Sequence, residues 1–96
     1  MTDLTGVVTS TPTFFYGTHT HCEHEQFGLH TASGDVRVID NVDIAPRVPV
    51  SIGDTVQVRG VVVQDPGKEP IIHWTHHDPA HKHPDGFIRF AGQTYA

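Results

Sequence analysis

The sequence predicts a small all-β domain whose strands close into a barrel, and three observations lead to this prediction. Several short segments are rich in β-branched residues and alternate between apolar and polar positions, which is the period of a strand. No stretch keeps helical periodicity for more than about two turns. The most regular β-rich segment, residues 55–64, carries Gly60 in its middle, where a glycine is typical of a bulge or a sharp bend. Closure also removes exposed edges, which are a liability in so short a chain.

Length and composition indicate one globular domain. The chain has 96 residues, which suffice for one hydrophobic core, so we expect a single domain over residues 1–96. Hydrophobic residues make up 36% of the chain and charged residues 18%, unlike a disordered sequence. The longest apolar run, residues 61–63, is too short to span a membrane. No basic and apolar leader follows Met1, so the chain as it stands is expected in the cytoplasm, and export would require a signal that has been removed.

Six strands are expected in chain order. They cover residues 4–9, 23–31, 36–39, 55–64, 71–75 and 87–90. Thr11 and Pro12 end the first strand, because proline cannot donate a hydrogen bond to a sheet. In the second strand Phe27 and Leu29 share one face, and the turn at residues 32–35 returns the chain to the third strand as a hairpin.

The remaining segments indicate how the sheet closes. Residues 41–50 contain two prolines and are expected to form a crossing loop. The run from Ile52 to Gly60 resembles the strand that turns a barrel corner in oligonucleotide/oligosaccharide-binding (OB) folds. A turn at residues 65–68 leads to the strand 71–75, and a loop leads on to the last strand. We therefore expect a five- to six-stranded OB-like Greek-key barrel.

Alternation within these strands assigns the core. The expected core residues are Phe27, Leu29, Val36, Val38, Val56, Val58, Val62, Ile72 and Trp74. In the strand 71–75 this assignment places Ile72 and Trp74 inward, and it leaves His73 and Thr75 on the outer face.

Histidine is the outlier of the composition, with nine residues in two short windows. The first window holds His19, His21, His24 and His30; the second holds His73, His76, His77, His81 and His83. This distribution predicts a site assembled where the two windows meet. The formal charge is −5 with neutral histidine, and protonation of the nine imidazoles near about pH 6.5 would invert its sign.

The run His73-Trp74-Thr75-His76-His77-Asp78-Pro79 resembles the motif that typifies a bacterial family of uncharacterised function. The segment 42–47, Gly53-Asp54, His24-x-x-Phe27 and the tail 83–88 fit the same pattern, so the resemblance covers the chain from about His24 onward. It implies an OB-like barrel whose members are often exported, with no established activity.

The resemblance also separates the histidines into two groups. Positions that match the family are His24, His73, His76, His77 and His83. The stretch with His19, His21 and Cys22 has no counterpart, and Asp40 stands where members often carry another histidine.

We predict a metal site at the matched positions. The hypothesis uses His24, His73 and one of His76 or His77, on the expectation that neighbouring strands bring the first two together. His83 returns from the loop as a further ligand. Asp78 is expected to accept a hydrogen bond from a ligand imidazole and so to orient that ring without contacting the ion itself. With one cysteine and many imidazoles zinc suits these ligands best, and copper and nickel stay open.

Two other interpretations of the same windows are open. His19, His21 and Cys22 form either a separate, weaker metal site or a solvated loop. The second window is alternatively a loop held by hydrogen bonds, with Asp78 as a turn cap.

The predicted function is a small binding module that takes up a transition metal for structure, sensing or sequestration. One alternative is a metal-dependent hydrolase or nuclease in which Glu23, Glu25 or Asp78 acts as general base. So short a chain has little length for a substrate cleft, which favours the binding module. A second alternative is single-stranded nucleic-acid binding, with Phe14–Tyr16 as a base-stacking platform. Only six lysines and arginines are present, without a patch, which argues against it.

Overall fold

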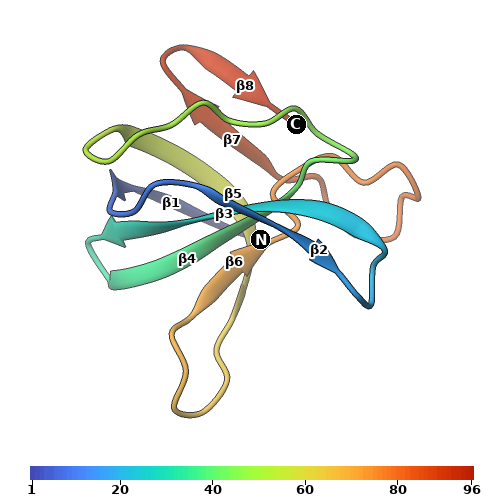
Figure 1. The fold of residues 1–96 in the computed structure, drawn as a ribbon, viewed down its shortest axis with the longest axis horizontal. Helices are drawn as coiled ribbons and strands as arrows, with labels where there is room; N and C mark the ends of the chain where they lie inside the picture. Colours follow the sequence, from blue (N-terminus) through green and yellow to red (C-terminus); the bar gives the residue numbers. More distant parts are fainter.

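The computed structural model describes residues 1–96 and contains strands but no helix (Figure 1). The strands are β1 (Thr2–Val8), β2 (Thr13–Gly17), β3 (Cys22–Thr31), β4 (Gly34–Asn41), β5 (Thr55–Val63), β6 (Ile71–His73), β7 (Phe87–Phe90) and β8 (Gln93–Tyr95). No helix with the length and apolarity needed to cross a membrane is present.

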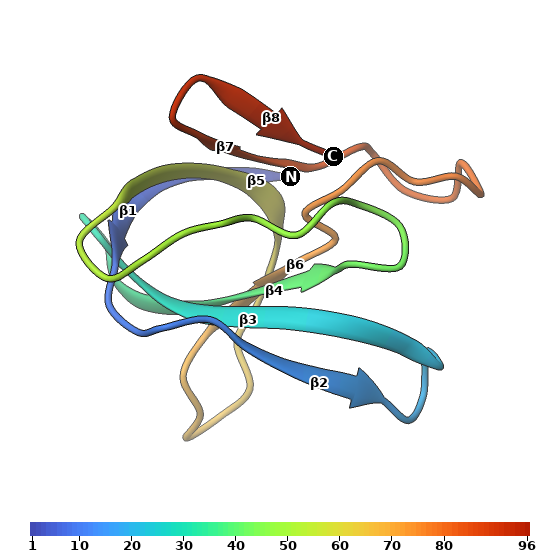
Figure 2. The same ribbon diagram turned by 45° about the horizontal axis from the view of Figure 1, so that its top comes forward.

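Five strands close into a barrel in the order β1-β3-β4-β6-β5, and β5 pairs back with β1. Figure 2 shows β5 curving around one side of this barrel. Neighbouring barrel strands are antiparallel except β4 and β6, which run parallel. The three other strands lie outside: β2 extends the sheet from β3, and β7 and β8 extend it from β5. The all-β fold class is confirmed, and the closed five-stranded barrel is consistent with a small OB-like barrel.

The barrel interior holds one hydrophobic core. Most of the predicted core residues are buried there: Phe27, Leu29, Val36, Val38, Val56, Val58 and Ile72. Val8 and Ile88 join them, and so do Val48 and Val50 from the loop between β4 and β5. The crossing loop therefore closes one side of the core as well as connecting two strands.

Two predicted core residues, Val62 and Trp74, are in fact exposed. Val62 is 39% exposed because β1 begins with Thr2 opposite Gly60, so beyond that point β5 is paired with β6 on one side but with no strand on the β1 side. Trp74 is 41% exposed because β6 ends at His73 and Trp74 takes a left-handed φ of 56°. The alternation of inward and outward side chains in β6 ends at His73, one residue before Trp74, so the indole is not directed into the core.

Gly60 is required by a close approach of two strands rather than by a bulge. Its pairing with Thr2 lies within a continuous ladder between β1 and β5. On the other side of β5 the neighbour changes from β7, at Arg59, to β6, at Val61. A Cβ at Gly60 would lie 2.4 Å from the carbonyl oxygen of His73, so any larger residue would push these strands apart.

Two strands, β2 and β8, were not expected from the sequence. The aromatic run in β2 shows no polar alternation, and most of the strand is exposed. Its order comes from antiparallel pairing with β3, from Thr13 opposite Gln26 to Gly17 opposite Cys22. The strand expected at residues 87–90 is present as β7 and continues through a tight turn into β8.

Candidate functional site

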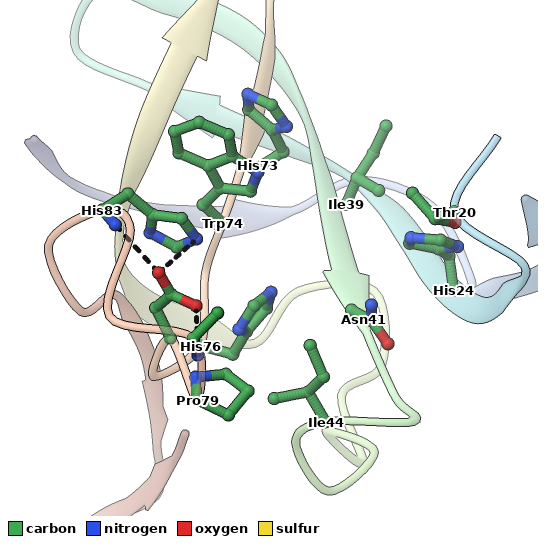
Figure 3. A pocket seen from close by; sticks show the side chains of 12 residues that line it. Thr20, His24, Ile39, Asn41, Ile44, His73, Trp74, His76, Pro79 and His83 are labelled. Atoms are coloured by element: carbon green, nitrogen blue, oxygen red, sulfur yellow. Dashed lines mark hydrogen bonds and ion pairs between the residues drawn. The ribbon is translucent and has the colours of Figure 1, made fainter.

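A cavity of about 290 Å³ lies against the outer face of β4 and β6 and is bounded by the loop that follows β6 (Figure 3). We call it the histidine pocket. It is lined by Thr20, His24, Ile39, Asn41, Ile44, His73, Trp74, His76, Asp78, Pro79, Ala80 and His83. The two histidine windows therefore meet in space, and four of the five family-like histidines face one cavity.

Strand alternation explains how His24 and His73 reach this face. Phe27 and Leu29 point into the core, which leaves His24 outward on β3, and buried Ile72 leaves His73 outward on β6. The expectation that β3 and β6 are neighbours is wrong, because β4 lies between them. His24 faces Asn41 on β4, and Figure 3 shows it on the opposite side of the pocket from His83.

Trp74 forms the centre of a stack of three aromatic rings. Its indole lies 4.9 Å from the ring of His73 and 4.1 Å from the ring of His83, at interplanar angles of 27° and 7°. Figure 3 shows the indole between the two imidazoles. Both faces of Trp74 are thus occupied by the protein itself, so they offer no free platform for a nucleobase.

Replacing Trp74 by alanine is expected to cost about 1–3 kcal/mol of unfolding free energy. The indole is partly exposed, so the change removes chiefly the two ring contacts, and such aromatic pairs contribute about 0.5–1.5 kcal/mol each. Urea denaturation measures it, with Phe27→Ala as the buried control at about 3–5 kcal/mol. Equal losses for the two variants would contradict the outward position of Trp74.

Three histidines of the pocket have one ring nitrogen engaged by the main chain. Nδ1 of His24 lies 3.0 Å from the carbonyl oxygen of Cys22, Nδ1 of His76 lies 2.5 Å from that of His77, and Nδ1 of His83 lies 2.9 Å from that of Pro84. A carbonyl oxygen can only accept, so Nδ1 must donate in each case. The neutral rings therefore carry their lone pair on Nε2, the arrangement common in metal-binding histidines.

The electrostatic surroundings favour the neutral imidazole at two histidines of the pocket, His73 and His76. Burial lowers the pKa of His73, and the nearby rings of His83 and His76 lower it further. Burial also lowers the pKa of His76, which is 5% exposed; the hydrogen bond to His77 opposes this effect and the neighbouring His83 adds to it. Lone pairs on these rings are consequently available near neutral pH.

Asp78 caps the turn that carries His83. Its carboxylate accepts hydrogen bonds from the main-chain N–H groups of Ala80, Lys82 and His83. Burial raises the pKa of Asp78, but these donors outweigh it and leave the pKa below its usual value. Nε2 of His83 lies 3.7 Å from Oδ2 of Asp78. The turn-cap interpretation is therefore confirmed, and Asp78 also lies beside a pocket imidazole.

The barrel also contains a pair of buried carboxyl groups that was not expected from the sequence. Glu25 and Asp40 face each other across β3 and β4 and are 1% and 0% exposed. Glu25 accepts a hydrogen bond from the main-chain N–H of Val48, and Asp40 accepts one from the hydroxyl of Thr75 at 2.9 Å. Burial raises both pKa values, that of Asp40 to about 7, and Oδ2 of Asp40 has no partner.

The positions of the three candidate general bases bear on the hydrolase alternative. Glu25 points into the core, and neither it nor Glu23 lines the histidine pocket. Asp78 does line it, but its oxygens are occupied by three N–H donors. The hydrolase alternative therefore gains no support from these carboxylates.

The remaining histidines lie outside the pocket. His19 and His21 occupy the exposed turn between β2 and β3, where the thiol of Cys22 donates to the carbonyl of Thr20 at 3.4 Å. His30 pairs with Asp35 at 2.6 Å on the surface. His77, predicted as an alternative ligand to His76, is exposed and does not line the cavity. No three histidine, cysteine or acidic side chains are gathered closely enough to hold an ion as they stand.

Comparison with known protein families finds a match over most of the chain. The model of a family described as protein of unknown function (DUF3465) matches residues 9–96. This span includes both histidine windows and every strand except β1. No curated protein and no solved structure matches the chain.

Proposed function

Since the chain belongs to the DUF3465 family of proteins of unknown function, its activity must be argued from its own side chains, and we propose that it binds a transition metal ion in the histidine pocket. The observation that carries the proposal is the main-chain engagement of Nδ1 in His24, His76 and His83. A ring fixed in this way presents Nε2 as a ligand atom without a further change of tautomer.

His76 and His83 are the primary ligands in this proposal. Their ring centres are 6.1 Å apart. A tetrahedral ion about 2 Å from two Nε2 atoms separates the ring centres by about 5 Å, so the rings need to approach by about 1 Å. His73 lies on the other side of the Trp74 ring, and His24 lies across the pocket, so each needs a larger rearrangement to complete the coordination.

Such a site suits reversible uptake better than a structural role. Structural zinc sites are closed by four protein ligands, whereas two primary imidazoles leave positions for water or for an exchanging ligand. Imidazole donors suit zinc, copper(II) and nickel, and the pocket holds no thiolate that would select copper(I). We therefore propose sensing or sequestration of a divalent ion, with zinc as the first ion to test.

The test compares two double variants by calorimetric titration with zinc, using untagged protein purified without nickel resin. His76→Ala with His83→Ala removes both primary ligands, and we expect the affinity to fall at least about tenfold. His19→Ala with His21→Ala, in the exposed turn, is the matched control and should keep the wild-type affinity. The proposal is wrong if the pocket variant retains the wild-type affinity for zinc, or if wild-type protein binds neither zinc nor, in the same titration, copper(II) or nickel.

A further inference from the structure

Strand β2 is an outermost strand with an apolar free edge. It pairs with β3 alone, and its other edge meets no strand (Figure 2). The strand reads Thr13-Phe-Phe-Tyr-Gly17 and contains neither a charged residue nor a proline. Phe14, Phe15 and Tyr16 are 42%, 36% and 59% exposed. Soluble proteins usually protect such an edge with lysine, proline or a bulge, so an unprotected one indicates a partner strand.

The other outermost strand shows the contrast. Strand β8 has three residues, and its exposed positions are the polar Gln93 and Thr94. An edge of this kind is short and polar, which discourages pairing. Strands β2 and β8 are each the last strand on their side of the sheet. They differ in that β2 is longer and has apolar aromatic side chains, whereas β8 is short and mostly polar.

We propose that the β2 edge pairs with the β2 edge of a second copy of this chain. Antiparallel pairing about a two-fold axis at Phe15 places Phe14 opposite Tyr16 of the second copy, and Thr13 opposite Gly17. The interface then contains three aromatic cross-strand pairs, one of Phe15 with its own counterpart and two of Phe14 with Tyr16, and such pairs are favourable in antiparallel sheets. The small Gly17 opposite Thr13 leaves the ends of the pairing free of steric conflict.

The charges beside β2 match this arrangement. At one end the guanidinium of Arg47 lies 4.4 Å from the ring centre of Phe14. At the other end Glu23 pairs with Tyr16, and the carboxylate of Asp43 accepts the main-chain N–H of Glu23. An antiparallel partner brings the cationic end of each copy toward the acidic end of the other, twice by symmetry. This complementarity favours a second copy over an unrelated apolar peptide.

The experiment is analytical ultracentrifugation of wild-type protein over a wide range of concentrations. Five paired residues form a small interface, so we expect a dimer with a dissociation constant in roughly the micromolar range. Tyr16→Lys places a charge on the edge and is expected to raise this constant at least about tenfold. Thr94→Lys on β8 is the matched control and should leave the constant unchanged.

Three results would overturn the proposal. Wild-type protein that stays monomeric at the highest concentration excludes the dimer. A dimer that Tyr16→Lys does not weaken, while circular dichroism shows the fold intact, excludes the β2 edge as its interface. Equal weakening by Thr94→Lys shows a general effect of charge. Slower amide hydrogen exchange in β2 at high concentration is the positive signature, since pairing protects the free edge.

Discussion

Replacing Asp40 by asparagine is expected to stabilise the protein above pH 7 and to flatten the dependence of its stability on pH. Asp40 is fully buried, Oδ2 has no partner, and Glu25 faces it across the strands. Burial is the main cause that raises the pKa of Asp40 from 3.8 to about 7. The hydrogen bond from Thr75 lowers this pKa, and the nearby carboxyl group of Glu25 raises it further. Asparagine has nearly the same shape, can still accept the hydroxyl of Thr75, and carries no charge.

The sign follows from the direction of the pKa shift. The folded state holds a proton on Asp40 that the unfolded chain releases above its ordinary pKa, so stability falls as the pH rises from about 4 to about 7. The full difference between 3.8 and about 7 corresponds to about 4 kcal/mol. The asparagine variant avoids this loss.

Urea denaturation at pH 5 and at pH 8 measures the effect. Between the two values wild-type protein should lose stability relative to Asp40→Asn, whereas the lowered pKa values of His73 and His76 change the stability of both proteins in the opposite direction and to the same extent. Asp65→Asn, which changes an exposed carboxylate in a turn, should follow the wild type. An Asp40→Asn protein with the same pH dependence as the wild type would show that Asp40 is ionised in the fold at no cost.

Replacing Gly86 by alanine is expected to cost about 3 kcal/mol or more of unfolding free energy. A Cβ there would lie 2.1 Å from the carbonyl oxygen of Trp74 and 2.5 Å from that of Arg59. Both contacts are main chain, so the loop end must move away from β5. The N–H of Gly86 also donates to the carbonyl oxygen of His76 at 2.9 Å, and this bond holds the pocket segment to the last strands.

The same substitution tests whether the histidine pocket depends on that anchor. The displaced loop carries His76 and His83, so we expect zinc affinity to fall at least about tenfold along with stability. Gly67→Ala is the control: its φ is 73° in an open turn, so it should cost only about 1–2 kcal/mol and leave zinc binding unchanged. A fully stable Gly86→Ala protein would contradict the close packing at this position.

Strand alternation predicted the inner face of the barrel well where strands have neighbours on both sides. Phe27 and Leu29 are buried for that reason. It failed at Val62 and Trp74 because local periodicity carries no information about where a covering strand ends or where φ becomes positive. Val48 is buried from an irregular loop, and no period marks such a residue.

For the site, clustering of histidines predicted that the two windows meet, and one histidine of the first window, His24, lines the same cavity as three of the second. It could not predict that β4 separates His24 from His73, because the parallel pairing of β4 with β6 joins segments far apart in sequence. The buried carboxyl pair did have a signal. Glu25 shares the parity of Phe27 and Leu29, so the same alternation places it inward.

Closure of the barrel between β1 and β5 has a kinetic consequence. Thr2 pairs with Gly60, so the pairing of β1 with β5 closes a loop of more than half of the chain. Strand β1 lacks this second neighbour until that loop has closed. Such a topology has high contact order, because the entropy of closing a long loop is lost before its contacts form. Refolding is therefore expected on the order of milliseconds to seconds, well below the rate of a helical bundle of this size. During synthesis β1 therefore cannot complete its pairing until β5 has been synthesised.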